Sequence, residues 1–150
     1  MKSEIITIGD ELLVGQVINT NQAYISEKLH GIGVSVERMT TVADEMQAIV
    51  DAFANACRRS DVVITTGGLG PTHDDITKKA VCKFFDTKLV SNDEVGKNIE
   101  VFLKKRNLSW TPAAQEQTMV PLKAELIPNP FGTAAGLLFA EKNRLFIVLP

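Results

Sequence analysis

The sequence has few cysteines, little net charge and no long apolar run. Its two cysteines, Cys57 and Cys82, each stand alone in a helical pattern. They form no metal-binding or redox motif and are interpreted as buried reduced thiols. The net charge of −2 provides no basic surface for nucleic acid. No apolar run could span a membrane, and the first residues lack a signal-peptide pattern. These absences predict a cytoplasmic protein that binds neither nucleic acid nor membranes.

The composition that remains is typical of a globular domain. Hydrophobic residues make up 45% of the 150 positions and charged residues 23%, which supplies a core and argues against disorder. The length and the absence of repeats and linkers predict one domain over residues 1–150. The chain stops at Pro150, directly after an apolar run, so we expect the domain to be truncated at its C-terminal end.

Apolar periodicity predicts alternating strands and helices. Strands are expected at 3–8, 34–42, 62–64, 124–127, 137–140 and 144–149, and helices at 19–30, 46–57, 76–85, 91–106 and 113–119. This order predicts a three-layer α/β/α sandwich with a mostly parallel sheet and a short β insertion. Three lysines of helix 76–85 are expected on its solvated face, although Lys78 or Lys79 could approach a phosphate.

A glycine-rich loop joins the apolar strand 62–64 to the helix that begins near residue 76. Gly67, Gly68 and Gly70 allow positive φ angles and a close approach of a ligand to the backbone. Several N–H groups can then surround an anion beside the positive end of the helix. A tight turn in which a side chain simply caps the helix explains the same residues equally well.

Two familiar glycine loops can be excluded. The dinucleotide fingerprint requires a third glycine where this chain has His73, and a P-loop requires lysine after Gly70, where Pro71 stands. Another type of nucleotide- or cofactor-binding loop is therefore expected.

Acidic residues follow three of the predicted strands. Asp10 follows the first strand, Asp44 the second, and Asp74 and Asp75 the glycine loop. The carboxyl ends of parallel strands meet at one edge of a sheet, where ligands bind in α/β folds. Carboxylates beside a phosphate require a divalent cation between them, or one of them serves as a base. Asp44 also suits the N-cap of helix 46–57, and Asp10 could lie in a solvated loop.

The residues at these positions resemble the amino-terminal domain of the CinA (competence/damage-inducible) proteins. That domain belongs to the molybdopterin-binding superfamily, with MogA and MoaB. The match lies at 8–13, 15–16, 19–21, 42–45, 66–72, 74–77, 129–130, 132–134 and 136, and its most specific string is Gly-Gly-Leu-Gly-Pro-Thr-x-Asp-Asp-x-Thr at 67–77. The family usually has proline where this chain has Ala135, and it continues beyond Pro150.

The resemblance implies a MogA-like fold, a homo-oligomer (dimer or trimer) and a small-molecule nucleotide or pterin as ligand. CinA-type domains resemble metal-dependent ADP-ribose pyrophosphatases, which release AMP and ribose 5-phosphate. In the molybdenum-cofactor relatives, acidic residues matching Asp44 and Asp75 serve adenylyl transfer to molybdopterin. Two alternatives therefore stay open: molybdopterin adenylyl transfer, and a module that binds a nucleotide or pterin without turnover.

The expected roles divide into three sets. The catalytic carboxylates are Asp75, then Asp44 and Asp74, with His73 as a further candidate acid. The ligands of a divalent metal, Mg²⁺ or similar, are Asp10, Asp44 and Asp75. The residues expected to contact phosphate or ligand are Gly9, Glu11, Thr66, Gly67, Gly68, Leu69, Gly70, Pro71, Thr72, Thr77, Asn129, Gly132, Thr133 and Ala134.

Overall fold

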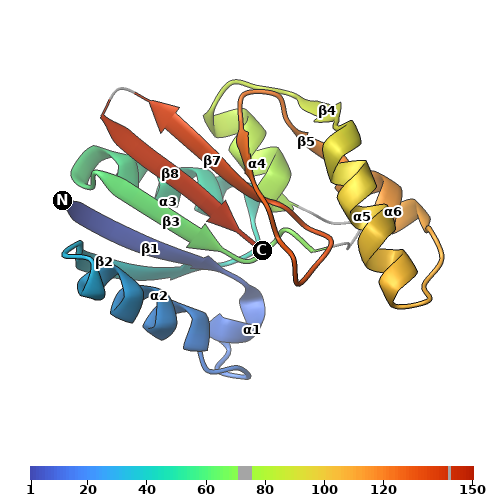
Figure 1. Ribbon diagram of the computed structural model, residues 1–150. Helices are drawn as coiled ribbons and strands as arrows, with labels where there is room; N and C mark the ends of the chain where they lie inside the picture. The colour runs from blue at the N-terminus through green and yellow to red at the C-terminus, as the bar shows by residue number, and fades with distance from the viewer. Residues whose placement is uncertain (71–75, 142) are drawn as a thin grey trace.

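A six-stranded sheet in the order β2-β1-β3-β8-β7-β6 runs through the molecule (Figure 1). The computed structural model describes residues 1–70, 76–141 and 143–150. Four neighbouring strands are parallel, whereas β7 is antiparallel to both β8 and β6. The strands of this sheet are β1 (Lys2–Ile8), β2 (Ser35–Val42), β3 (Val62–Thr66), β6 (Glu125–Ile127), β7 (Gly136–Glu141) and β8 (Arg144–Leu149).

Helices cover both faces of the sheet and form three layers with it. The helix α2 (Thr20–Gly31) lies against β1 and β2 on one face, and α3 (Met46–Arg59) and α4 (Ile76–Phe84) lie on the other. The predicted sandwich with a mostly parallel sheet is confirmed. Within the described ranges, no helix combines the length and the apolar character that a membrane crossing requires.

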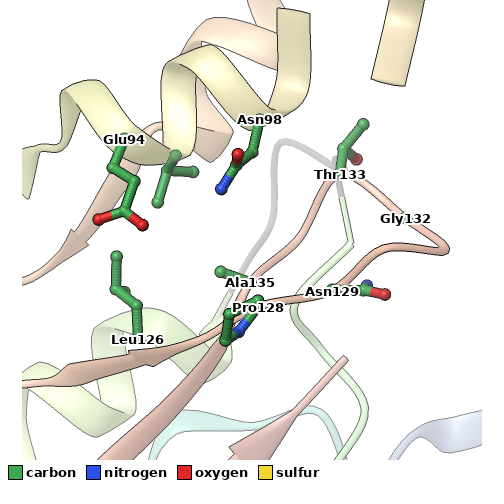
Figure 2. A pocket seen from close by; sticks show the side chains of 9 residues that line it. Glu94, Asn98, Leu126, Pro128, Asn129, Gly132, Thr133 and Ala135 are labelled. Atoms are coloured by element: carbon green, nitrogen blue, oxygen red, sulfur yellow. The ribbon is translucent and has the colours of Figure 1, made fainter. Parts of the chain in front are cut away.

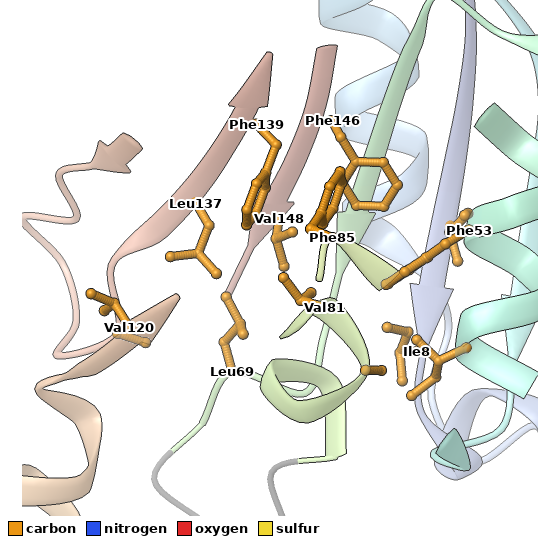
Figure 3. Packing of buried hydrophobic residues seen from close by; sticks show 14 of the residues in the cluster. Ile8, Phe53, Leu69, Val81, Phe85, Val120, Leu137, Phe139, Phe146 and Val148 are labelled. Carbon is orange, nitrogen blue, oxygen red and sulfur yellow. The ribbon is translucent and has the colours of Figure 1, made fainter. Parts of the chain in front are cut away.

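The main core lies between the sheet and the α3/α4 layer (Figure 3). Apolar residues spaced by three and four along α3 place Ile49 and Phe53 in this core, where both are fully buried. Phe53 meets Phe146 edge to face at a centroid distance of 4.8 Å, and Phe85 stacks on Phe139 at 4.0 Å. These aromatic contacts join α3, and the residue directly after α4, to the β7–β8 hairpin.

A buried ion pair lies on β1, near the end of the sheet at which the chain begins. The Glu4 carboxylate is 1% exposed and accepts two hydrogen bonds from Arg59, at 2.8 and 2.7 Å, and one from Thr40 at 2.8 Å. Burial raises the pKa of Glu4, but these hydrogen bonds and the charges of Arg59 and Arg38 outweigh it and hold the pKa below 4.5. The pair fixes the last turn of α3 to β1.

A separate unit is inserted between α4 and β6. It consists of β4 (Leu89–Ser91), α5 (Asp93–Lys105), α6 (Pro112–Gln117) and β5 (Met119–Pro121), with β4 and β5 paired antiparallel. A β insertion was expected, but these two strands were not located, because each has three residues and Pro121 lies in one of them. Thr111 caps the short helix α6, since its hydroxyl accepts a hydrogen bond from the Ala114 N–H.

Two other local expectations are corrected. The acidic segment after β1 forms a single helical turn, α1 (Asp10–Leu13). The helix α3 begins at Met46 with Glu45 in the N-cap position and no side-chain cap, so Asp44 does not cap it. The Asp44 backbone N–H instead donates a hydrogen bond to Asp10, which ties the segment after β2 to the segment after β1.

Candidate functional site at the carboxyl edge of the sheet

The parallel strands bring three chemically important segments to one edge. Ile8 at the end of β1 is in register with Val42 of β2, and Thr7 is in register with Thr66 of β3. The segments that follow β1, β2 and β3 therefore begin side by side. The expected meeting of Asp10 with the segment of Asp44 is confirmed at this edge.

The side chain of Asp10 contacts the backbone of Asp44. The Asp44 N–H donates a hydrogen bond of 3.2 Å to Oδ1 of Asp10, and the Gly9 N–H donates one of 3.1 Å to the Val42 carbonyl. Gly9 therefore shapes the edge, and its N–H is already used. Carboxylate oxygens are the ligands that Mg²⁺ prefers, so the chemistry of this pair fits the expected cation. In the described part of the chain, no group of three acidic, histidine or cysteine side chains is placed to hold a metal ion.

Several expected site residues lie outside the described residues. They are Pro71, Thr72, His73, Asp74 and Asp75. Asp75 is among them, and it is both the third expected metal ligand and the first candidate for the catalytic carboxylate.

The glycine loop requires glycine at two of its three glycine positions. Gly67 has φ 98°, and a Cβ there would overlap the carbonyl oxygen of Ile8. Gly68 has φ 71°, and a Cβ there would overlap Oγ1 of Thr77. Gly70 has neither constraint within the described residues. The first two glycines therefore let the loop pass directly against the end of β1 and the first turn of α4.

Threonine hydroxyls border this loop on both sides. Oγ1 of Thr66, before the loop, and Oγ1 of Thr77, after it, are buried, and neither forms a hydrogen bond to a described residue. A buried hydroxyl without a partner is unfavourable, and both could donate to a bound anion. The Leu69 side chain is 1% exposed in the core, so only its backbone remains for a ligand. Lys78 is also buried, which corrects the expectation of a solvated position.

A hollow of about 170 Å³ lies beside the loop on the α2 face of the sheet. Thr66, Gly67 and Glu11 line it, together with Asn19, whose amide donates a hydrogen bond of 2.9 Å to the Thr7 hydroxyl. Asn19 also caps α2, since its Oδ1 accepts a hydrogen bond from the Gln22 N–H. Its position in this hollow was not predicted, because it depends on the pairing of β1 with β3.

The second expected loop is built around Asn129. Its Oδ1 accepts a hydrogen bond from the Phe131 N–H at 3.0 Å, and its Nδ2 donates one to the Ala134 carbonyl at 2.9 Å. A Cβ on Gly132 would approach Nδ2 to 2.9 Å. Asn129 and Gly132 therefore shape the loop, and the Ala134 side chain is buried. Of the four residues expected here, Thr133 is the one whose polar side chain is left for a ligand.

A second pocket, of about 90 Å³, lies between this loop and α5 (Figure 2). Thr133, Pro128 and Ala135 line it from the loop, and Glu94 and Asn98 line it from α5. Sequence reasoning missed the last two, although they stand four residues apart on a predicted helix and share one face of it. Only the fold shows that this face is opposite the loop.

The comparison with known proteins agrees with the fold. A model of the family described as "Probable molybdopterin binding domain" matches residues 4–150. The chain belongs to this family. A CinA-like protein of Kosmotoga olearia is 43% identical over 150 residues, which is all of this chain and 36% of that protein. The chain spans 36–55% of the length of the first curated relatives it matches.

Solved structures place the chain among the CinA members of the molybdopterin-binding family. The crystal structure of CinA from Thermoplasma acidophilum is 35% identical, with a TM-score of 0.88, over 99% of this chain and 87% of that one. The predicted resemblance to CinA is confirmed. MoaB from Thermus thermophilus, described as a molybdopterin biosynthesis enzyme, is 22% identical, with a TM-score of 0.63, over 99% of this chain and 80% of that one. That likeness shows the shared fold.

Proposed function

We propose that this domain hydrolyses a nucleotide diphosphate linkage, with ADP-ribose as substrate and AMP and ribose 5-phosphate as products. The observation that supports this most is the contact between Asp10 and Asp44 at the strand edge against which the glycine loop packs. Anion donors and carboxylates at one edge are what a diphosphate with a divalent cation requires. The cation would be Mg²⁺ or a similar hard ion.

Each set of residues has a role in this proposal. The loop N–H groups and the hydroxyls of Thr66 and Thr77 bind the diphosphate oxygens. Asp10 and Asp44, with Asp75 as the third candidate, would hold the cation, which would supply charge neutralisation to the phosphates. A carboxylate, Asp75 first and Asp44 second, accepts a proton from the attacking water as its oxygen bonds to phosphorus and the bridging P–O bond breaks. The phosphate group of the departing product takes the electron pair of the broken P–O bond as negative charge.

Molybdopterin binding, with or without adenylyl transfer, is the second candidate function. The matching family model favours it, because that family is described by molybdopterin binding. The same anion loop would hold the pterin phosphate, and the cation would assist transfer of AMP from ATP. A module that binds a nucleotide or pterin without turnover would use the same surface.

One incubation series separates these functions. The protein is given ADP-ribose, or ATP plus molybdopterin, with and without Mg²⁺, and the products are separated by ion exchange. Mg²⁺-dependent AMP from ADP-ribose, lost in Asp44→Asn, supports the proposal. The matched control is Asp51→Asn, which changes an exposed carboxylate on α3 whose partner is Gln47. Adenylylated pterin would favour the second candidate, and binding without product would favour the module.

A homo-oligomer is part of the proposal. The segment between α1 and α2 carries three strongly exposed apolar side chains, with Val14 68%, Val17 54% and Ile18 85% exposed. Adjacent exposed apolar side chains of this kind often mark an interface between subunits. Sedimentation velocity of the wild type and of Ile18→Ser tests this, and a wild type that sediments as a monomer would contradict it.

A further inference from the structure

The pocket between α5 and the second loop has two polar side chains on one wall and apolar side chains around them. Figure 2 shows Glu94 directed from α5 toward Leu126 of β6, and Asn98 directed from α5 toward Ala135 of the loop. Leu126, Pro128 and Ala135 line the opposite side. Neither polar side chain forms a hydrogen bond or ion pair with another described residue. Both are therefore available to a ligand.

The polar pair sets the chemistry that the pocket can recognise. A carboxylate only accepts hydrogen bonds, whereas an amide offers both a donor and an acceptor. The two side chains stand one helical turn apart, separated by about 6 Å along the axis. A flat heterocycle that bears an amino group beside a ring nitrogen or oxo group can donate to Glu94 and accept from Asn98. Apolar side chains such as Pro128 suit the faces of the ring.

The pocket also lies at a suitable distance from the glycine loop. Gly136, directly after the second loop, starts the strand β7, which is separated from β3 only by β8. Two strand spacings correspond to about 10 Å, which is within the span of a nucleotide from its diphosphate to its base. Leu69 of the glycine loop packs in the same core as Leu137 of β7 (Figure 3). Leu69 therefore connects the described part of the glycine loop with the strand that follows the second loop.

We infer that Glu94 and Asn98 recognise the amino-substituted edge of the heterocycle, either an adenine base or a 2-amino-4-oxo pterin. This rests on the proposed function for the position of the phosphates. The selected feature is the amino group, because it is the donor that the Glu94 carboxylate requires. Heterocycles that carry an oxo group at that position, such as hypoxanthine, place an acceptor against the carboxylate and are rejected.

Binding titrations with matched ligand pairs test the inference on the whole chain. Calorimetry compares AMP with IMP, and a 2-amino-4-oxo pterin with its 2,4-dioxo counterpart, and the pair that is discriminated identifies the source of the heterocycle. A charge-assisted hydrogen bond gives an expected preference of about tenfold for the amino ligand. Glu94→Gln should reduce that ratio to about one, because glutamine can also donate to an oxo group.

Asp93→Asn is the matched control. Asp93 and Glu94 both lie in the first turn of α5, where either carboxylate complements the helix dipole, but Asp93 does not line this pocket. If Glu94 had only a structural role, Glu94→Gln would weaken the binding of both ligands of a pair equally. Asp93→Asn is expected to have that effect. Retention of the preference in Asp93→Asn together with its loss in Glu94→Gln supports the inference.

The outcomes also separate this inference from the proposed function. An equal affinity for both members of each pair, no binding of any of the four ligands, or a preference that survives Glu94→Gln overturns the inference. Amino-ligand preference without any AMP release from ADP-ribose leaves the inference standing and refutes the hydrolysis. Hydrolysis of inosine diphosphate ribose to IMP that is as fast as release of AMP from ADP-ribose, and unchanged in Glu94→Gln, does the reverse.

Discussion

Replacing Gly67 by alanine should destabilise the protein strongly, because two independent costs meet at this residue. Its φ of 98° lies outside the region that L-residues adopt readily, which costs about 1–2 kcal/mol. The new Cβ would also overlap the Ile8 carbonyl, a backbone atom that cannot move without shifting β1; an overpacked site costs about 1–3 kcal/mol. The expected loss of about 2–5 kcal/mol is a large part of the stability of a single domain.

Urea denaturation of alanine variants at two other glycines separates these two costs. Gly15 has φ 73°, and a Cβ added there would have no atom within 4 Å, so Gly15→Ala reports the backbone cost alone. Gly70→Ala meets neither cost and should change the unfolding free energy by less than about 0.5 kcal/mol. The reasoning is refuted if Gly67→Ala unfolds at the same urea concentration as Gly15→Ala. That result would mean that the loop can move away from β1 freely.

Three further changes test the anchors of the site. Leu69→Ala removes a fully buried side chain and should cost about 2–5 kcal/mol in urea denaturation; a cost below about 1 kcal/mol, well under this range, would argue against the buried loop. The pKa of Glu4 is lowered from 4.5 in the folded state. Its ion pair therefore stabilises the fold above that pH, and this stabilisation is lost as the pH falls through the folded-state pKa. Glu4→Gln should therefore flatten the acid limb of a stability–pH curve, and an unchanged slope would contradict this. Asn129→Ala removes both hydrogen bonds that shape the second loop. It should weaken AMP binding while the melting temperature changes little. Unchanged binding would show that the loop does not contact the ligand.

The layers of the fold could be predicted because the signals are local. The apolar spacing along α3 and the β-branched run of β3 specify a helix and a buried strand without reference to the rest of the chain. Parallel strands then place the ends of β1, β2 and β3 at one edge, so Asp10 and Asp44 could be expected near the glycine loop. What failed were short elements, such as α1 and the β4–β5 pair, whose existence depends on tertiary contacts.

The roles of single residues were harder to predict, because they depend on what the backbone already uses. Gly9 was expected to contact the ligand, but its N–H is bonded to Val42. Asp44 was equally suited to a helix cap, and only the hydrogen bond to Asp10 shows which neighbour it has. Asn129 acts on its own loop. In each case the sequence indicates that the residue lies at the site. Its hydrogen-bond partner in the folded chain then decides whether it shapes the backbone or faces a ligand.

In the proposed function, the reaction and the choice of substrate belong to different parts of the fold. The carboxylates and the glycine loop belong to the parallel strands, whose register fixes them within one or two strand spacings. Glu94 and Asn98 belong to the inserted unit, which joins the sheet through packing such as that of Val120 near Leu69 (Figure 3). A change on the exposed face of α5 can therefore alter the preferred heterocycle without moving the carboxylates. A substitution at Gly67 would not be confined in this way, because Gly67 packs against the end of β1 and begins the loop whose Leu69 is buried in the core with Leu137 of β7.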